Sequence, residues 1–388
     1  DGREGSDLYV YANPGTIEIA YGERAMSLAA SLDITLPDAS YGISVKRSPD
    51  AATWTPTTQY DLLANIEGFQ GGSSDDVIAG SDVDNLIAAS GGHDRLDAGG
   101  GFDYLKTLEN DTVDLTLGRL KNVSGATAEL NGFEAVMGAG GNETLLGDAS
   151  NNRLEGWEGS DVLAGRSGND HLLGGDGNDL LQGGVGIDLL EGGAGADLLD
   201  GGAGIDAVSY LGSSDGIDVN LLKGQGYIGD SEGDRFLNVE DVIGSEYDDT
   251  MSGGSGNNVL VGDKGSDEIS GCDGNDTIYG DQSPLVTSAL PGSHFDFSSQ
   301  SAAANPTCDC DSASAQDILD GLDSLFGDTA SHTDYVDEID GGDGDDVIYG
   351  QSGSDLLRGD CGNDYLYGGH QVDVLLGGIG DDTLEGGG

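Results

Sequence analysis

Basic residues are scarce in this 388-residue chain. Only 14 Lys and Arg stand against 72 Asp and Glu, which gives a formal net charge of -58 at pH 7. A surface this acidic repels nucleic acid and anionic membranes and favours cations as ligands. We therefore expect no nucleic acid partner, and we expect the chain to repel itself open when no cations are bound.

Long apolar runs are also missing, so the sequence predicts no transmembrane segment and no signal peptide at its start. There is no His-Glu-x-x-His zinc motif. Residues 212–216 match Gly-x-Ser-x-Gly, but a nucleophile elbow needs a buried strand before it and a helix after it, and polar turn residues flank this match. The sequence predicts no catalytic constellation in this segment, and a catalytic domain elsewhere in a longer protein would not be visible in it.

Glycine is abundant, with 70 residues, and much of it follows a nine-residue period. From Gly138 to Ser209 the units follow one another without a gap, and GGDGNDLLQ from Gly174 is among the clearest. Glycines at positions one, two and four permit a tight turn with positive φ, and Asp at position six supplies a carboxylate. The last three residues form a short strand whose position-eight side chain faces the core. Two units then make one coil.

Four runs of such units begin at Gly71, Gly138, Gly244 and Gly341 and contain 4, 8, 4 and 5 units. Position eight is Ile, Leu, Val or Met in every unit, from Ile78 to Leu384. A flexible glycine-rich linker has no reason to keep an aliphatic residue at one phase of nine. The pattern therefore predicts a solenoid, which is one continuous stack.

The position-six carboxylates are candidate calcium ligands. Calcium takes about six to eight oxygen ligands in a flexible geometry, so backbone carbonyls and one Asp from each of two stacked turns make a suitable cage. Ordering so many glycines costs entropy, so we expect metal binding and folding to be one event. The candidate ligands are Asp76, Asp94, Asp103, Asp161, Asp170, Asp179, Asp188, Asp197, Asp206, Asp249, Asp267, Asp276, Asp346, Asp355, Asp364, Asp373 and Asp382.

These units resemble the RTX, or haemolysin-type, calcium-binding repeats. The resemblance implies an all-β, right-handed parallel β-roll that binds several Ca²⁺ ions. It also implies export through a type I secretion system and folding outside the cell. It does not imply one biological role, since the repeat accompanies toxins, proteases, lipases, epimerases, adhesins and surface-layer proteins.

The runs divide the chain into segments. In order they are the end of a repeat with a β-rich spacer (1–70), run 1 (71–105), a spacer (106–137), run 2 (138–209), a spacer (210–243), run 3 (244–280), an insertion with a degenerate repeat (281–340) and run 4 (341–388). Short alternating stretches such as TIEIAY predict strands in the first spacer. We expect the spacers to form larger rungs, or small β-structures stacked on the roll.

Each spacer leads back to the repeats in the same way, with Glu67, Glu134 and Glu240 each four residues before the first turn glycine. The second unit of each of the first three runs has Asn at position six, at Asn85, Asn152 and Asn258. This Asn is either ordinary degeneracy or a neutral oxygen ligand in rows that lack a complete turn beneath them, where a carboxylate would be a charge without its cation.

The insertion contains GLDSLFGD, in which Gly321, Asp323 and Leu325 match a degenerate unit, so we expect it to leave and rejoin the roll at one turn. That placement puts the units at 271 and 359 on opposite edges and disfavours a bridge between Cys272 and Cys361. Three disulfide pairings exist, and we favour Cys361 with the insertion, at Cys308 or Cys310. A metal or redox role for Cys-x-Cys lacks a second such motif nearby.

Position seven is expected to face outwards. Val162, Leu180 and Leu198 then share one outer face, whereas His171, Leu189 and Ala207 share the other. The first set is an apolar stripe that would serve self-association or a surface assembly.

Two functions from different classes remain open. The chain is either part of an extracellular structural protein, such as an adhesin, surface layer or filament, or the calcium-dependent tail of a secreted enzyme or toxin. Several runs with spacers favour the first. The sequence begins and ends inside repeat units, so we expect it to be a segment of a longer protein.

Overall fold

The computed structural model describes residues 8–10, 17–20, 41–46, 60–64, 68–71, 75–89, 91–281 and 336–388. It contains two compact units, Asp1–Val185 (unit 1) and Gly186–Gly388 (unit 2). The regular elements in the described residues are β-strands and one short 3-10 helix, η1 (Gly229–Ser231). In this part of the chain no helix is long and apolar enough to cross a membrane.

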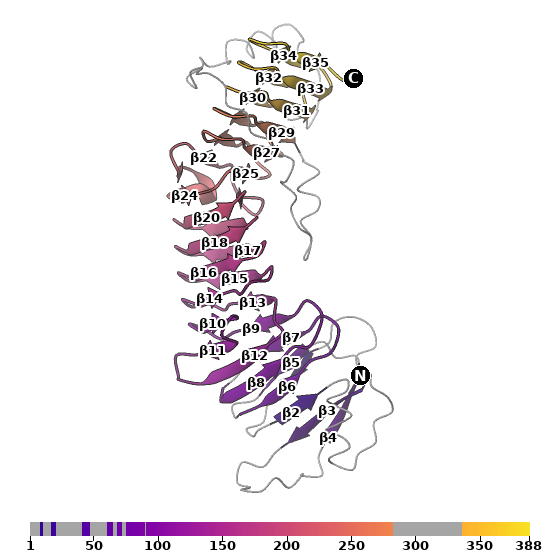
Figure 1. Cartoon of the computed structure of the whole chain (residues 1–388), viewed down its shortest axis with the longest axis vertical. Helices are drawn as coiled ribbons and strands as arrows, with labels where there is room; N and C mark the ends of the chain where they lie inside the picture. Colours follow the sequence, from indigo (N-terminus) through magenta and orange to yellow (C-terminus); the bar gives the residue numbers. More distant parts are fainter. Residues whose placement is uncertain are drawn as a thin grey trace. The chain divides into compact units, whose positions relative to one another are not determined.

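The strands of each unit form two sheets, A and B, whose members stack in succession (Figure 1). In unit 1, sheet A consists of β1 (Leu8–Val10), β5 (Gly68–Gln70), β7 (Leu86–Ala88), β9 (Tyr104–Lys106), β13 (Ala135–Met137), β15 (Arg153–Glu158) and β17 (His171–Asp176). Sheet B consists of β2 (Ile17–Ala20), β3 (Tyr41–Lys46), β4 (Tyr60–Ala64), β6 (Val77–Ala79), β8 (His93–Asp97), β10 (Thr112–Asp114), β11 (Arg119–Lys121), β12 (Thr127–Asn131), β14 (Thr144–Leu146), β16 (Val162–Ser167) and β18 (Leu180–Gly186).

Unit 2 repeats this arrangement. Sheet A consists of β19 (Leu189–Ala194), β21 (Ala207–Ser209), β25 (Asp241–Ile243), β27 (Val259–Asp263), β29 (Thr277–Asp281), β31 (Val347–Ser352), β33 (Tyr365–His370) and β35 (Thr383–Glu385). Sheet B consists of β20 (Leu198–Gly204), β22 (Asp218–Asn220), β23 (Gln225–Gly226), β24 (Arg235–Leu237), β26 (Thr250–Ser252), β28 (Glu268–Ser270), β30 (Glu338–Asp340), β32 (Leu356–Arg358) and β34 (Val374–Leu376).

Two nonapeptides make one coil, as predicted. Strands 18 residues apart pair in parallel, so that Val162 lies opposite Leu180 in sheet B and Arg153 lies opposite His171 in sheet A. The position-eight side chains fill the space between the sheets, and Leu145, for example, is completely buried. The predicted parallel β-solenoid is therefore confirmed, and its core is the aliphatic ladder that the sequence period specifies.

The spacers are strand-rich, and the three share one topology. Each contributes three antiparallel strands to sheet B: β2–β3–β4, β10–β11–β12 and β22–β23–β24. The first strand of the spacer pairs in parallel with a later coil, as β10 does with β14 and β22 with β26. In the second and third spacers the last strand pairs with an earlier coil, as β12 does with β8 and β24 with β20. The chain thus runs backwards along the stack within each of these two spacers.

The insertion interrupts a single turn. Gly280 lies directly against the side chain of Asp337, and Ile339, two residues further on, is completely buried at the core position. Isolated parallel β-bridges join Asp273 to Asp343 and Asp343 to Cys361. They place the turns that begin at residues 271, 341 and 359 on one edge.

Our prediction that the units at 271 and 359 lie on opposite edges is therefore wrong, because only one nonapeptide separates β29 from β31. The predicted degenerate unit at Gly321 lies outside the described residues. Cys272 and Cys361 are two strand spacings apart along the stack, or about 9.6 Å, which is too far for a disulfide. Cys361 is disulfide-bonded. Its predicted partners, Cys308 and Cys310, lie outside the described residues.

The outer faces differ from the prediction in unit 2. Leu189 and Ala207, at position seven, are neighbours in sheet A and are only 4% and 0% exposed. They belong to an apolar cluster with Ile243, Val259 and Val261, against which Tyr279 packs. At Leu189, Ala207 and Val259, position seven is thus part of a second buried layer. Val162 and Leu180 in unit 1 and Leu198 in unit 2 are half-buried.

Candidate metal-binding turns

The position-six aspartates lie inside the turns, where the coils stack. Fifteen of the predicted ligands are buried: Asp76, Asp94, Asp103, Asp161, Asp170, Asp179, Asp188, Asp197, Asp206, Asp249, Asp267, Asp276, Asp346, Asp355 and Asp364. Asp373 and Asp382, in the last two complete turns, are half-buried. The predicted ligands therefore lie along two edges of an apolar core.

One carboxylate oxygen of many of these aspartates joins successive coils. Oδ1 of Asp179 accepts a hydrogen bond from the backbone N–H of Asp161, 18 residues earlier, at 2.7 Å. Oδ1 of Asp346 likewise accepts from the N–H of Asp276 at 2.7 Å, although 70 residues separate them. These contacts place one carboxylate directly above another along each edge and satisfy a buried backbone donor at each step.

The other carboxylate oxygen remains available in many turns. Among the described residues, Oδ2 of the following aspartates is buried and accepts no hydrogen bond: Asp103, Asp161, Asp206, Asp267, Asp276, Asp346, Asp355, Asp364 and Asp373. A buried anionic oxygen without a donor is costly, so this arrangement requires a cation or a proton.

The missing Cβ of the position-one glycine leaves room for that cation. A Cβ at Gly156 would lie against Oδ2 of Asp161 and 2.6 Å from the carbonyl oxygen of Gly174 in the next turn. At Gly341 it would lie 2.5 Å from Oδ2 of Asp346 and 3.0 Å from the carbonyl oxygen of Gly359. A carboxylate oxygen and a carbonyl oxygen from two coils thus converge on one glycine in both units.

Position four also has to be glycine in these turns. Gly177 has a φ of 151°, and a Cβ there would overlap the carbonyl oxygen of Gly159 in the previous turn. The backbone carbonyls of stacked turns therefore approach one another without intervening side chains, which is the environment that the hard Ca²⁺ ion prefers.

Burial raises the pKa of the turn carboxyls in the metal-free protein. Desolvation raises the pKa of Asp161 to about 7, and the charge of Glu143 adds to the effect. Desolvation and the neighbouring carboxylate of Asp346 raise the pKa of Asp276 to about 8. For Asp337, burial and repulsion by Asp267 raise the pKa to about 9. A divalent cation removes this penalty by binding the deprotonated forms.

The Asn turns have a different conformation. Oδ1 of Asn152 accepts the backbone N–H of Asp148 at 2.7 Å, and Oδ1 of Asn258 accepts that of Gly254 at 2.7 Å. The Nδ2 group of Asn258 also donates to the carbonyl oxygen of Glu240 in the preceding coil. These turns use the Asn oxygen for a hydrogen bond within the turn, and the reading of that oxygen as a neutral metal ligand stays a prediction.

Four carboxylates that the sequence analysis did not assign to the sites continue the two edges. Glu134 accepts the backbone N–H of Asp103 at 3.0 Å, and Glu240 accepts that of Asp206 at 2.9 Å. Asp234 and Asp337 do the same for Asp197 and Asp267. Glu134, Glu240 and Asp337 each stand two residues before an aliphatic residue and four before a turn glycine, and this spacing could have identified them.

Position five also escaped the sequence analysis. The backbone N–H of Asn169 donates to Oδ1 of Asn151 at 2.8 Å, and that of Asn363 donates to Oδ1 of Asp345 at 2.8 Å. This ladder runs in the opposite direction to the one at position six. It explains why Asn, Asp and Ser recur at a position that the nonapeptide pattern leaves open.

No group of three or more His, Cys, Asp or Glu side chains suited to a metal ion occurs within the described ranges. The stacked turns bring carboxylates and backbone carbonyls together instead, and carbonyls are good ligands for calcium. The buried Oδ2 atoms and the glycine spaces beside them fit such an ion. The fold and these turns define a calcium-binding parallel β-roll.

Comparison with protein families agrees with this geometry. The RTX calcium-binding nonapeptide repeat family matches residues 70–105, 137–172, 173–208, 243–278, 333–366 and 352–384, which together make up about half of the chain. The chain belongs to this family. No curated protein matches it significantly.

Proposed function

We propose that this chain is a secreted structural segment whose β-roll folds when it binds Ca²⁺ outside the cell. The observation that carries the proposal is the array of buried carboxylates, each with an oxygen beside a glycine that leaves space for an ion. The individual aspartates named above are the proposed ligands.

The charge of the chain supports folding on calcium. The chain has a net charge of -58 and buries many of its carboxylates. Repulsion between these carboxylates therefore opposes compaction of the metal-free form at neutral pH. Cytosolic calcium is scarce and extracellular calcium is abundant, so the same chain would remain open before export and close after it. This behaviour suits an extracellular location.

The spacers support a structural role. The second and third have the same three-stranded form and the same pairing with the coils before and after them, so the architecture is modular. A modular roll extends by adding runs, which suits an adhesin, surface layer or filament. The alternative is the calcium-dependent tail of a secreted enzyme or toxin, and the complete reading frame would distinguish the two.

Self-association is part of the structural proposal. Val162 and Leu180 are adjacent in sheet B and half-buried, so they offer an apolar strip to a second copy. Replacing Leu180 with Lys should then reduce calcium-dependent self-association in sedimentation experiments and leave the fold intact. Unchanged sedimentation would reject this strip as the interface.

Calcium removal tests the central proposal. In excess EDTA at pH 7.5 the full chain should lose its β circular dichroism and expand in small-angle scattering, and added Ca²⁺ should restore both steeply. Mg²⁺ is the control ion, because its stricter octahedral geometry suits these turns poorly. A chain that remains compact and β-rich in EDTA would contradict the proposal.

A further inference from the structure

The turn from Gly147 to Asn152 lacks the features that favour an ion in the neighbouring turns. Oδ1 of Asn152 accepts the N–H of Asp148, and Oδ1 of Asp148 accepts the N–H of Ser150 at 2.7 Å. Nδ2 of Asn152 lies 3.4 Å from the carbonyl oxygen of Glu134 in the preceding coil. The amide oxygen carries no charge, so the carboxylate of this turn is that of Asp148 at position two and not one at position six.

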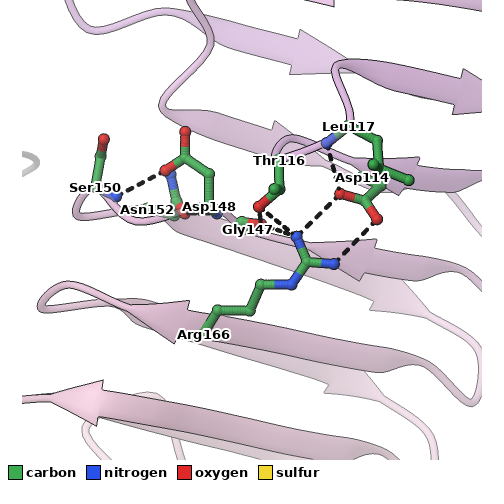
Figure 2. A network of polar contacts seen from close by, with 8 residues as sticks. All are labelled: Asp114, Thr116, Leu117, Gly147, Asp148, Ser150, Asn152 and Arg166. Carbon is green, nitrogen blue, oxygen red and sulfur yellow. Dashed lines mark hydrogen bonds and ion pairs between the residues drawn. The ribbon is translucent and has the colours of Figure 1, made fainter.

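A guanidinium group lies at this turn (Figure 2). Nη1 of Arg166 is 2.7 Å from the carbonyl oxygen of Gly147, the position-one carbonyl, and 2.6 Å from Oγ1 of Thr116. In the Asp turns the equivalent carbonyl, for example that of Gly174, borders the proposed ion site on the side of the preceding coil. Here it receives a positively charged donor from the protein itself.

The same guanidinium binds the spacer. Nη1 and Nη2 of Arg166 contact Oδ1 and Oδ2 of Asp114 at 2.9 and 3.0 Å, which is the two-pronged pairing that a planar guanidinium makes with a carboxylate. The Asp114 side chain is 15% exposed. Its hydrogen bonds with Arg166 hold the pKa of the Asp114 carboxyl below its usual range.

The position of Arg166 in the repeat is unusual. It occupies position two of its own nonapeptide, where the four runs have no other basic residue. Its backbone has a left-handed φ of 81°. Glycine commonly stands at this position and also has a positive φ, for example 109° at Gly175. The turn therefore aims a long cationic side chain back at the preceding turn of the same edge.

We infer that the Arg166 guanidinium takes the place of a bound cation at the Gly147–Asn152 turn and fastens the β10–β11 hairpin of the spacer to run 2 without calcium. The row of calcium ions proposed for this edge of run 2 then begins after the Gly147–Asn152 turn. This inference rests on the proposed calcium loading of the Asp turns.

A pair of variants that differ only at residue 166 tests the inference. In both, the turn is converted to the repeat consensus by Asp148→Gly, Ser150→Gly and Asn152→Asp, and one also has Arg166→Gly. Calcium bound per full-length chain is counted by equilibrium dialysis. We expect one additional ion with Gly at 166 and none with Arg. Equal counts in the two variants, whether raised or unchanged, would overturn the inference.

A single substitution gives a second measurement on an otherwise native chain. In saturating calcium, Arg166→Met should leave the number of bound ions unchanged and speed amide exchange at residues 114–117 by about 10-fold or more, as expected for a charged hydrogen-bonded pair. Arg95→Met is the matched control, because Arg95 also joins a run to this spacer, at Glu129, but both side chains are largely exposed.

Loss of one ion in Arg166→Met would show that the arginine supports a calcium site instead of replacing it, and would overturn the inference. Unchanged exchange at residues 114–117 would do the same. If the native chain binds no calcium at all, the proposed function itself fails, and the dialysis of the unmodified protein reveals this separately.

Discussion

Two consecutive nonapeptides of run 2 form opposite kinds of turn. In the turn from Gly156 to Asp161, Trp157 and Gly159 have left-handed φ values of 78° and 143°, and Oδ2 of Asp161 accepts no hydrogen bond from any described residue. In the turn from Gly147 to Asn152, the position-two N–H donates to the Asn152 side chain instead. A change from carboxylate to amide thus accompanies a change from a turn that needs an ion to one that closes on itself.

The same contrast recurs in unit 2 between the Asp276 turn and the Asn258 turn, whereas in the Asp249 turn the position-two N–H of Ser245 donates to the Asp side chain. Gly274, at position four of an Asp turn, has a φ of 138°, and a Cβ there would lie 2.5 Å from the carbonyl oxygen of Gly256. Gly256, at position four of the Asn258 turn, has nothing within 4 Å of its Cβ direction. Glycine is therefore a packing requirement in the first turn and a dispensable residue in the second.

The largest effect is expected from substitution of the position-four glycine, which should harm an Asp turn and leave an Asn turn almost unchanged. Gly274→Ala should destabilise the calcium-loaded protein by about 2–5 kcal/mol, from the left-handed φ and the clash together. Gly256→Ala should change stability by less than about 1 kcal/mol. Urea unfolding in saturating calcium compares the two, and equal losses would show that the turns do not differ as described.

A second prediction concerns position six. Asp161→Asn removes an anionic ligand, so the variant should bind less calcium and lose about 2–4 kcal/mol at calcium far above the dissociation constant. Asn152→Ala removes hydrogen bonds only and should leave the ion count unchanged. Isothermal titration of both variants measures the number of bound calcium ions. Loss of an ion in Asn152→Ala would show that calcium binds in the Asn152 turn, contrary to this prediction.

The pH dependence sharpens the comparison further. In the metal-free fold, burial raises the pKa of Asp267 and Asp276 to about 8, above the ordinary value of roughly 4 in an unfolded chain. Protonation therefore stabilises this fold fully below about pH 4, and the contribution is lost as the pH rises through about 8. In EDTA the β signal should be stronger at pH 5 than at pH 8.

Calcium has the opposite preference because it binds the deprotonated carboxylates, so binding at pH 7 should release protons. Titration heats measured in two buffers of different ionisation enthalpy would detect the release. Heats that do not depend on the buffer would contradict the raised pKa values.

The smallest effect is expected for a contact outside the turns. The Arg95–Glu129 pair joins run 1 to the spacer at 2.7 Å, but its side chains are 66% and 68% exposed. Arg95→Met should cost about 0–1 kcal/mol. A larger loss in thermal unfolding would mean that surface ion pairs, and not the turns, hold the spacer in place.

The sequence predicted the features that depend on one nonapeptide at a time. The aliphatic residue at position eight and the Asp at position six identified Leu145 and Asp161 correctly as core and edge residues, because each is fixed by local turn and strand geometry. Features that depend on the next coil were missed. Glu134 lies outside any nonapeptide, and it joins the edge only because β13 stacks on β9.

Arg166 was missed for the same reason, since its partners are Asp114, 52 residues away, and the turn one coil earlier. The burial of Leu189 and Ala207 depends on residues of later coils, among them Val259 and Val261. The edge assignment of Cys361 failed because the sequence analysis placed the rejoining point at the degenerate unit of Gly321, whereas Asp337 completes the turn that Gly280 begins.

The reversed path of the spacers affects the order in which the roll assembles. A stack of nonapeptides needs only its nearest neighbour to grow, so folding can advance along a run one coil at a time. The spacer from β10 to β12 instead has one strand paired with β8 and another with β14, so it is not complete until chain on both sides is present. Growth that starts at either end must therefore pause at each such spacer, and the spacers divide the roll into segments that fold in steps.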